Sequence, residues 1–301
     1  MAKKFRGIFP ALVTPFAGGT LSETVDLDAF KGNIGVLNSI GLSGYVVLGS
    51  TGECVSLTPG ESLALLRTAK TAAAPGKLVI AGTGQESTLQ TIEFTNAAAR
   101  LGIDAALVRP PSYFKAKMSR EALRRHYLAV ADAAEVPVIV YNIPQNTGVT
   151  IDPSLVVELA AHPNIAGLKE SSGSVSYLEE VVAHVPKDFS YLVGSGYVIL
   201  PALVLGASGA ILAVANAAPA QCVGIYELFQ AGKIEDAARL QLGVAPLNKA
   251  VMDTYGIAGL KHALRRTGQN GGLVRPPLLP IDDKGREDID SLMNDLAALR
   301  R

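Results

Sequence analysis

The stretch Ile165-Ala166-Gly167-Leu168-Lys169-Glu170-Ser171 determines how the rest of this chain is interpreted. It reads as a short apolar strand that ends at Lys169, and the following Ser-Ser-Gly leads into a helix. Burying an ammonium group costs free energy unless the group is paired or deprotonated. A desolvated amine is a nucleophile toward carbonyl carbons, so Lys169 is a candidate for forming a Schiff base. The alternative is a lysine whose long stem carries its charge from the strand end to water.

The composition favours a large globular domain in a reducing compartment. The 301 residues are 49% apolar and 18% charged, and the 27 basic and 27 acidic residues are interspersed. This balance argues against disorder and against a nucleic-acid-binding surface. The two cysteines, Cys54 and Cys222, are too few for a disulfide framework. The first ten residues lack the apolar segment of a signal peptide, so we expect a cytoplasmic protein.

A long uncharged segment, residues 189–226, raises the question of a membrane span. Residues 197–215 are numerous enough to cross a bilayer. Pro201 and Gly206, among other residues, divide the segment into pieces of helix and strand length. A buried helix followed by a buried parallel strand has the same apolarity, so we expect no membrane association.

Short apolar runs alternate with amphipathic stretches through the first three quarters of the chain. Eight strand–helix units with continuously apolar strands predict an α/β fold, the (β/α)8 TIM barrel, with a C-terminal helical appendage. A doubly wound open sheet is the alternative, but Gly82-Thr83-Gly84 lacks the third glycine of its phosphate-binding fingerprint. We expect a barrel over residues 1–230 that carries the active site, and a helical region over 231–301 with helices near residues 234–255, 259–267 and 288–299. The expected strands are residues 8–13, 45–48, 78–81, 105–108, 138–141, 165–169, 191–193 and 210–214.

The chemistry of a barrel lies at the C-terminal ends of its strands. Those ends supply one amine, phenols and several hydroxyl groups: Thr14, Ser50, Thr51, Tyr113, Tyr141, Lys169 and Ser195. The four histidines are not spaced as pairs of metal ligands, so we expect no metal site. An amine with phenols and without a metal indicates carbonyl chemistry through an imine.

Three short motifs carry a family resemblance: residues 49–53 (GSTGE), 141–144 (YNIP) and 167–171 (GLKES). In this order they resemble the pyruvate-dependent class I aldolases of the dihydrodipicolinate synthase and N-acetylneuraminate lyase superfamily. The resemblance extends over essentially the whole chain. It implies a lyase that acts on a 2-oxo acid such as pyruvate, needs no cofactor beyond an imine with Lys169, and forms a homotetramer built as a dimer of dimers.

The same resemblance assigns roles to individual positions. Lys169 matches the Schiff-base lysine, and Tyr141 matches the tyrosine that moves protons at the imine and the substrate hydroxyl. We expect Ser50 or Thr51, together with Tyr113, to help Tyr141 relay the hydroxyl proton. Ser50 and Thr51 match the pair whose backbone N–H groups hold the pyruvate carboxylate, which suits a loop that opens toward a helix N-terminus. Tyr113 matches a tyrosine that reaches into a neighbouring subunit's site, although Pro110-Pro111-Ser112 departs from the family pattern there. Backbone positions that line the site correspond to Gly194 and Ile211.

Departures from the family patterns bear on the substrate. Dihydrodipicolinate synthases usually have an arginine at the position of Asn146, and that arginine binds the carboxylate of aspartate semialdehyde. Neuraminate lyases have an acidic pair where this chain has Gly196-Tyr197. The resemblance is closest to 4-hydroxy-2-oxoglutarate aldolase, with Ser171 and Asn146 as hydrogen-bond partners for the departing glyoxylate. The alternatives are 4-hydroxy-tetrahydrodipicolinate synthase, an aldolase for 2-keto-3-deoxy sugar acids, and a non-catalytic protein that binds a keto acid.

Overall fold

A computed structural model describes residues 5–19 and 23–298 of the chain. Eight strands form one sheet in the order β1-β10-β9-β8-β7-β6-β5-β4. From β4 to β10, each strand therefore lies beside the strand that follows it in the sequence. A parallel bridge between Ala11 and Val46 links the two edge strands, so the sheet is a nearly closed barrel. The predicted (β/α)8 fold is thereby confirmed. The strands are β1 (Gly7–Pro10), β4 (Gly44–Val47), β5 (Leu78–Gly82), β6 (Ala105–Val108), β7 (Val138–Asn142), β8 (Ile165–Glu170), β9 (Ser190–Val193) and β10 (Gly209–Leu212).

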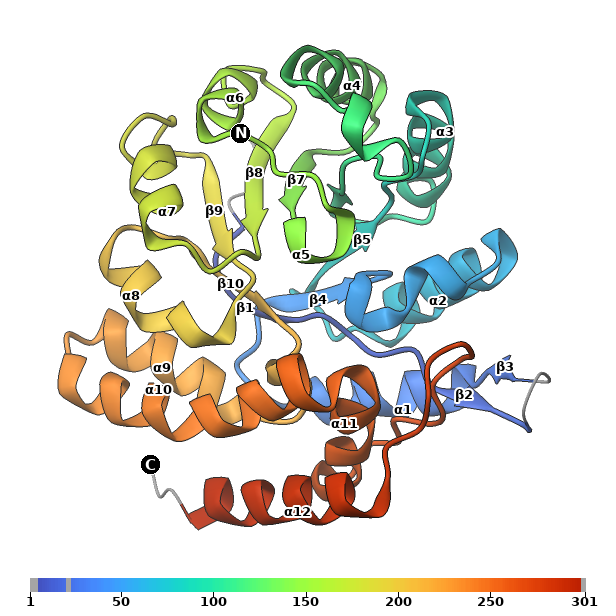
Figure 1. Ribbon diagram of the computed structural model, residues 1–301, viewed down its shortest axis with the longest axis vertical. Helices are drawn as coiled ribbons and strands as arrows, with labels where there is room; N and C mark the ends of the chain where they lie inside the picture. Colours follow the sequence, from blue (N-terminus) through green and yellow to red (C-terminus); the bar gives the residue numbers. More distant parts are fainter. Residues whose placement is uncertain (1–4, 20–22, 299–301) are drawn as a thin grey trace. The chain divides into compact units, whose positions relative to one another are not determined.

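The chain divides into two compact units, each described here by itself. Unit 1 comprises Met1–Gly7 with Ile80–Ile211, and unit 2 comprises Ile8–Val79 with Leu212–Arg301. In unit 1, Figure 1 shows helices outside the strands that they follow, which explains why β6 to β9 are buried on both faces. The helices of unit 1 are α3 (Thr88–Ala99), α4 (Arg120–Ala133), α5 (Pro144–Thr147), α6 (Pro153–Leu159), α7 (Val175–Val182) and α8 (Ile199–Val204).

Unit 2 contains the remaining helices and a short hairpin, drawn in the blue and the orange to red of Figure 1. Its hairpin pairs β2 (Phe16–Ala17) with β3 (Thr24–Val25), strands of two residues that show no periodicity in the sequence. Its helices are α1 (Leu27–Leu37), α2 (Pro59–Ala72), α9 (Pro219–Gln230), α10 (Ile234–Lys249), α11 (Gly256–Ala263) and α12 (Asp283–Ala298).

The C-terminal helices differ in their boundaries from the prediction. We expected one helix over residues 234–255, but α10 ends at Lys249 and a π-helix, Ala250–Thr254, follows. Pro246 lies inside α10 and has no N–H to donate, which disturbs the regular hydrogen-bond pattern there. The last helix begins at Asp283, five residues before the predicted start at residue 288, and its Gly285 N–H donates to the Asp282 carboxylate (2.8 Å). The proposed boundary near residue 230 between two domains stays a prediction.

No helix in the described part of the chain is both long and apolar enough to cross a membrane.

One ion pair in unit 2 joins the start of α2 to the C-terminal loop. Glu61 forms a capping box with Thr58, and both of its carboxylate oxygens accept hydrogen bonds from the Arg275 guanidinium (2.7 and 3.0 Å). This guanidinium, opposed by the smaller effect of burial, lowers the pKa of Glu61 to about 2. A bidentate pair of this kind is stronger than an ordinary surface ion pair.

We expect this pair to make stability depend on acid pH. Because the pKa of Glu61 is about 2 in the folded chain and about 4.3 when unfolded, its contribution is complete above pH ~4.3 and is lost as the pH falls toward 2. Glu61→Gln should lower the free energy of urea unfolding by about 1–2 kcal/mol at pH 7 and by about half as much at pH 3. An equal loss at both pH values would contradict this assignment.

Candidate active site

Lys169 and Tyr141 lie side by side on adjacent strands. Tyr141 of β7 is the register partner of Lys169 of β8, so the two side chains project from the same face of the sheet. The Lys169 Nζ donates to the Tyr141 hydroxyl (3.0 Å) and lies 4.1 Å from the centroid of its ring. Each residue is only 4% exposed, so the lysine charge does not reach water as the alternative interpretation required. The structure thus places a buried amine against a phenol, as chemistry through an imine needs.

A buried carboxylate fixes the turn that follows Lys169. The strand continues one residue further than predicted, to Glu170, whose side chain is 1% exposed and lies on the opposite face. It accepts hydrogen bonds from Asn142 Nδ2 (3.2 Å), the Ser172 N–H (2.7 Å) and the Gly173 N–H (3.2 Å). We did not predict this role from the sequence. The available signal was that Asn142 directly follows Tyr141 and that Glu170 directly follows Lys169. Glu170 therefore fixes the backbone directly after Lys169.

The structure brings Ser171 and Gly194 together at this turn. The Gly194 N–H donates to the Glu170 carbonyl (2.5 Å), and the Ser171 N–H donates to the Asn142 carbonyl (3.0 Å). A Cβ at position 194 would lie 1.9 Å from Ser171 Oγ, so a side chain is excluded there. Ile211 is buried in β10.

A cation lies beside the loop that carries Asn146. Asn146 is exposed on the short helix α5, which ends at Gly148 with φ +63°. A Cβ built on Gly148 would meet Lys115 Cδ at 3.0 Å and Lys115 Nζ at 3.6 Å. Residues 141–151 contain no charged side chain. The Lys115 ammonium therefore places a positive charge beside a loop that has none of its own.

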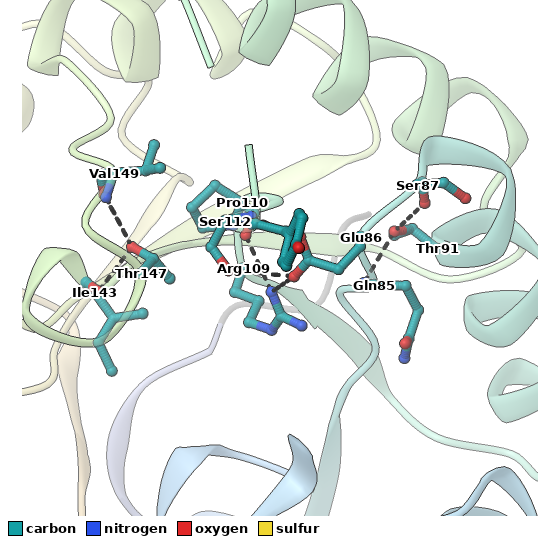
Figure 2. A network of polar contacts seen from close by, with 11 residues as sticks. Gln85, Glu86, Ser87, Thr91, Arg109, Pro110, Ser112, Ile143, Thr147 and Val149 are labelled. Carbon is teal, nitrogen blue, oxygen red and sulfur yellow. Dashed lines mark hydrogen bonds and ion pairs between the residues drawn. The ribbon is translucent and has the colours of Figure 1, made fainter. Parts of the chain in front are cut away.

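The loop that carries Tyr113 is fixed by Glu86, as Figure 2 shows. The Glu86 carboxylate accepts from the N–H groups of Ser112 (2.9 Å) and Tyr113 (2.8 Å) and from Arg109 Nη1 (2.8 Å). Burial opposes ionisation, but these donors outweigh it and lower the pKa of Glu86 to about 2. Tyr113 itself is 81% exposed and packs edge to face on Phe114. Its side chain is thus presented outward on a rigid loop.

Ser50 and Thr51 belong to unit 2 and form a 3₁₀ turn with Gly52. The Glu53 N–H closes the turn on the Ser50 carbonyl (3.0 Å), and the Thr14 hydroxyl donates to the Gly52 carbonyl (2.7 Å). Both predicted residues are partly accessible. The first N–H groups of such a turn have no carbonyl partner within it, so they are available to an anion.

Three histidines are paired with a carboxylate or buried. His162 contacts Asp132 (3.0 Å), His262 contacts Asp290 (3.2 Å), and burial lowers the pKa of His126 to about 4. Over residues 5–19 and 23–298, no three His, Cys, Asp or Glu side chains are grouped so that they could hold a metal ion.

Comparison with known proteins agrees with this geometry. Residues 4–296 match the model of the dihydrodipicolinate synthetase family. The chain belongs to this family. It is 36% identical to a protein named 4-hydroxy-tetrahydrodipicolinate synthase from Methanosphaerula palustris, over 92% of this chain and 94% of that one. A protein of the same name from Exiguobacterium sibiricum is 38% identical over 93% and 94% of the two chains.

Solved structures of family members have the same fold. A dihydrodipicolinate synthase from Bacillus anthracis superposes with a TM-score of 0.91 at 30% identity, over 99% of both chains. The protein of that name from Thermotoga maritima gives 0.92 at 28% identity, over 99% of this chain and 100% of that one. The resemblance found in the sequence is confirmed at the level of the family, and the narrower likeness to 4-hydroxy-2-oxoglutarate aldolase is not.

The bonds of Glu170 lead to a test of its structural role in the turn. In Glu170→Gln, the side-chain NH₂ would face N–H donors that now bond to a carboxylate, leaving at least one of them unsatisfied. We expect the free energy of unfolding to fall by about 1–3 kcal/mol. Glu179→Gln, an exposed position on α7, is the control and should change it by less than about 0.5 kcal/mol. Equal effects of the two substitutions in urea titrations would contradict the role.

Proposed function

We propose that this chain is a class I aldolase, a lyase that forms a Schiff base between Lys169 and a 4-hydroxy-2-oxo acid. One observation carries the proposal: a buried amine lies 3.0 Å from a buried tyrosine hydroxyl in a member of the dihydrodipicolinate synthetase family. A protein that only binds keto acids has no use for this reactive pair.

The proposed mechanism starts with attack of Lys169 Nζ on the C2 ketone of the substrate, and loss of water gives a protonated imine. This cation withdraws electrons, so the C3–C4 bond breaks with its electron pair delocalised into an enamine. Tyr141 accepts the proton of the C4 hydroxyl group as the aldehyde leaves. Protonation of the enamine at C3 and hydrolysis of the imine release pyruvate and free Lys169. The imine supplies the electrophilic activation, so the proposal includes no cofactor or metal.

The remaining predicted residues have supporting roles in this proposal. The N–H groups of Ser50 and Thr51 hold the substrate carboxylate, and Gly194 and Ile211 line the site. Tyr113 acts in a neighbouring subunit of a homotetramer, for which its 81% exposure on a fixed loop is suitable.

For the aldehyde half, we propose 4-hydroxy-2-oxoglutarate as substrate and glyoxylate as product. Asn146 is a neutral amide at the position where family synthases have an arginine, and it cannot bind a carboxylate as a charged fork does. Arg109 cannot replace that arginine, because its guanidinium is paired with Glu86 (2.8 Å). Asn146 and Ser171 would instead donate hydrogen bonds to the glyoxylate end.

A second candidate is condensation of pyruvate with aspartate semialdehyde, the reaction of a 4-hydroxy-tetrahydrodipicolinate synthase. Two observations favour it: the names of the relatives, and the Lys115 ammonium beside Gly148. A lysine supplies the charge for the semialdehyde carboxylate, although without the bidentate geometry of arginine.

Trapping the imine tests the chemistry common to both candidates. Pyruvate with borohydride should add one reduced pyruvyl group per chain, and peptide mass spectrometry should locate it on Lys169. Lys169→Ala should abolish labelling and turnover but keep the circular dichroism spectrum of the wild type. Labelling at another lysine would disprove the mechanism, and labelling without turnover of any 2-oxo acid would indicate a binding protein.

A substrate comparison decides between the two candidates. We expect the wild type to release pyruvate from 4-hydroxy-2-oxoglutarate at least about 10-fold more efficiently than it condenses aspartate semialdehyde, because a missing bidentate charge pair costs at least that factor. Asn146→Arg should shift this ratio toward the semialdehyde. If the wild type prefers the semialdehyde and Lys115→Met removes that preference, the second candidate is correct.

A further inference from the structure

Lys261 of α11 is a lysine buried in unit 2, outside the chemistry described above. It is 2% exposed, and its Nζ contacts three oxygens: Glu53 Oε1 (2.5 Å), the Leu273 carbonyl (2.5 Å) and the Thr14 carbonyl (2.7 Å). The two carbonyls accept hydrogen bonds and Glu53 forms an ion pair, so the ammonium, which has three N–H donors, has three oxygens around it. Such complete pairing in the interior requires that all three segments be held in fixed positions.

Glu53, the main partner of Lys261, has an unusual backbone conformation. Its φ of +55° and ψ of +37° lie in the left-handed region, which residues other than glycine seldom occupy. Its carboxylate is held on both sides, since Oε2 accepts from the Arg275 N–H (2.9 Å) while Oε1 faces Lys261. A conformation of this kind persists only where the surrounding contacts impose it.

Two sets of contacts connect the Gly52–Glu53 peptide, which closes the Ser50–Gly52 turn, to this one ammonium. In the first, the Glu53 N–H donates to the Ser50 carbonyl and the Glu53 carboxylate pairs with Lys261. In the second, the Thr14 hydroxyl donates to the Gly52 carbonyl (2.7 Å), and the Thr14 carbonyl accepts from Lys261. Movement of this peptide would therefore disturb the contacts of a buried charge.

We propose that Lys261 and Glu53 are positioning residues that hold the Ser50–Gly52 turn in the geometry that binds the substrate carboxylate. This inference rests on the proposed function, in which the N–H groups of Ser50 and Thr51 bind that carboxylate. The two residues do not touch substrate in this account, and they act through the backbone of the turn.

The cost of the pair supports a positioning role over simple stabilisation. Burial, with a smaller effect of nearby Arg275, lowers the pKa of Lys261 to about 8, although Glu53 opposes the shift. The pair thus carries a cost of burial that Glu53 offsets only in part. Apolar residues of similar size stabilise an interior as well as a buried ion pair does. What such residues cannot do is fix a left-handed glutamate and two carbonyl groups in one arrangement.

The test measures how strongly pyruvate is bound before the covalent step is trapped. Lys261→Met keeps an unbranched side chain, one atom shorter, and removes all three contacts of the ammonium. We expect the pyruvate concentration that gives half-maximal borohydride labelling of Lys169 to rise roughly 10-fold or more, with the labelling yield at saturation changed by less than about 3-fold. A purely structural role would lower the melting temperature and leave the half-saturation concentration of the folded protein unchanged.

Lys77→Met is the matched control. Lys77 is a partly buried lysine of the same unit, and its Nζ donates to the carbonyls of Ile40 (2.7 Å) and Leu42 (2.6 Å). Like Lys261, it is an ammonium that donates to backbone carbonyls, but it makes no bond to the turn. Its substitution should therefore leave the pyruvate concentration for half-maximal labelling unchanged. A shift as large as that of Lys261→Met would overturn the inference.

Glu53→Gln keeps the test decisive if Lys261→Met does not fold. The amide oxygen can still accept from the Arg275 N–H, but the charge opposite Lys261 is lost. We expect a smaller rise in half-saturation, roughly 3- to 10-fold. If both variants unfold, or if either folded variant keeps the wild-type pyruvate concentration for half-maximal labelling, this inference is wrong while the proposed function stands. Absence of labelling in the wild type would instead show that the proposed function is wrong, and the inference with it.

Discussion

The register between β7 and β8 is the constraint on which the candidate site depends. Because Tyr141 is opposite Lys169, the phenol meets the amine on one face of the sheet, and because Asn142 is opposite Glu170, the amide meets the carboxylate on the other. A slip of one residue would exchange the faces and leave Glu170 without its side-chain donor. The buried residues on both sides of this strand pair therefore enforce the same alignment.

Two buried carboxylates are stabilised in different ways. Glu170 accepts hydrogen bonds from nearby groups: the N–H groups of the two residues after Ser171 and the Asn142 amide of the neighbouring strand. Glu53 instead depends on a lysine and a backbone N–H from the C-terminal part of the chain. Both hold a loop that follows a strand, and in both the cost of burying a charge is offset only when every bond is present.

The sequence predicts those features that arise from neighbouring residues. The strands at 138–141 and 165–169 are recognisable from continuous apolar runs, and Lys169 and Tyr141 are recognisable as polar groups that close them. Two other features are not recognisable from the sequence: the proximity of Lys115 to Gly148 and the pairing of Glu53 with Lys261. Each joins segments that are far apart in the chain and are brought together by packing. The start of α12 was placed too late, since its acidic first turn resembles a loop when no apolar period is visible.

Unit 2 is discontinuous in sequence, and this has a consequence for how the protein is made. Its first segment ends at Val79 and its second begins at Leu212. Ribosomes add about 5–20 residues per second and release the N-terminal part first. Glu53 is therefore translated well before the lysine that neutralises it, and its carboxylate remains hydrated while the intervening strands are synthesised. The contacts that hold the loop with GSTGE can form only after α11 and Arg275 have left the ribosome.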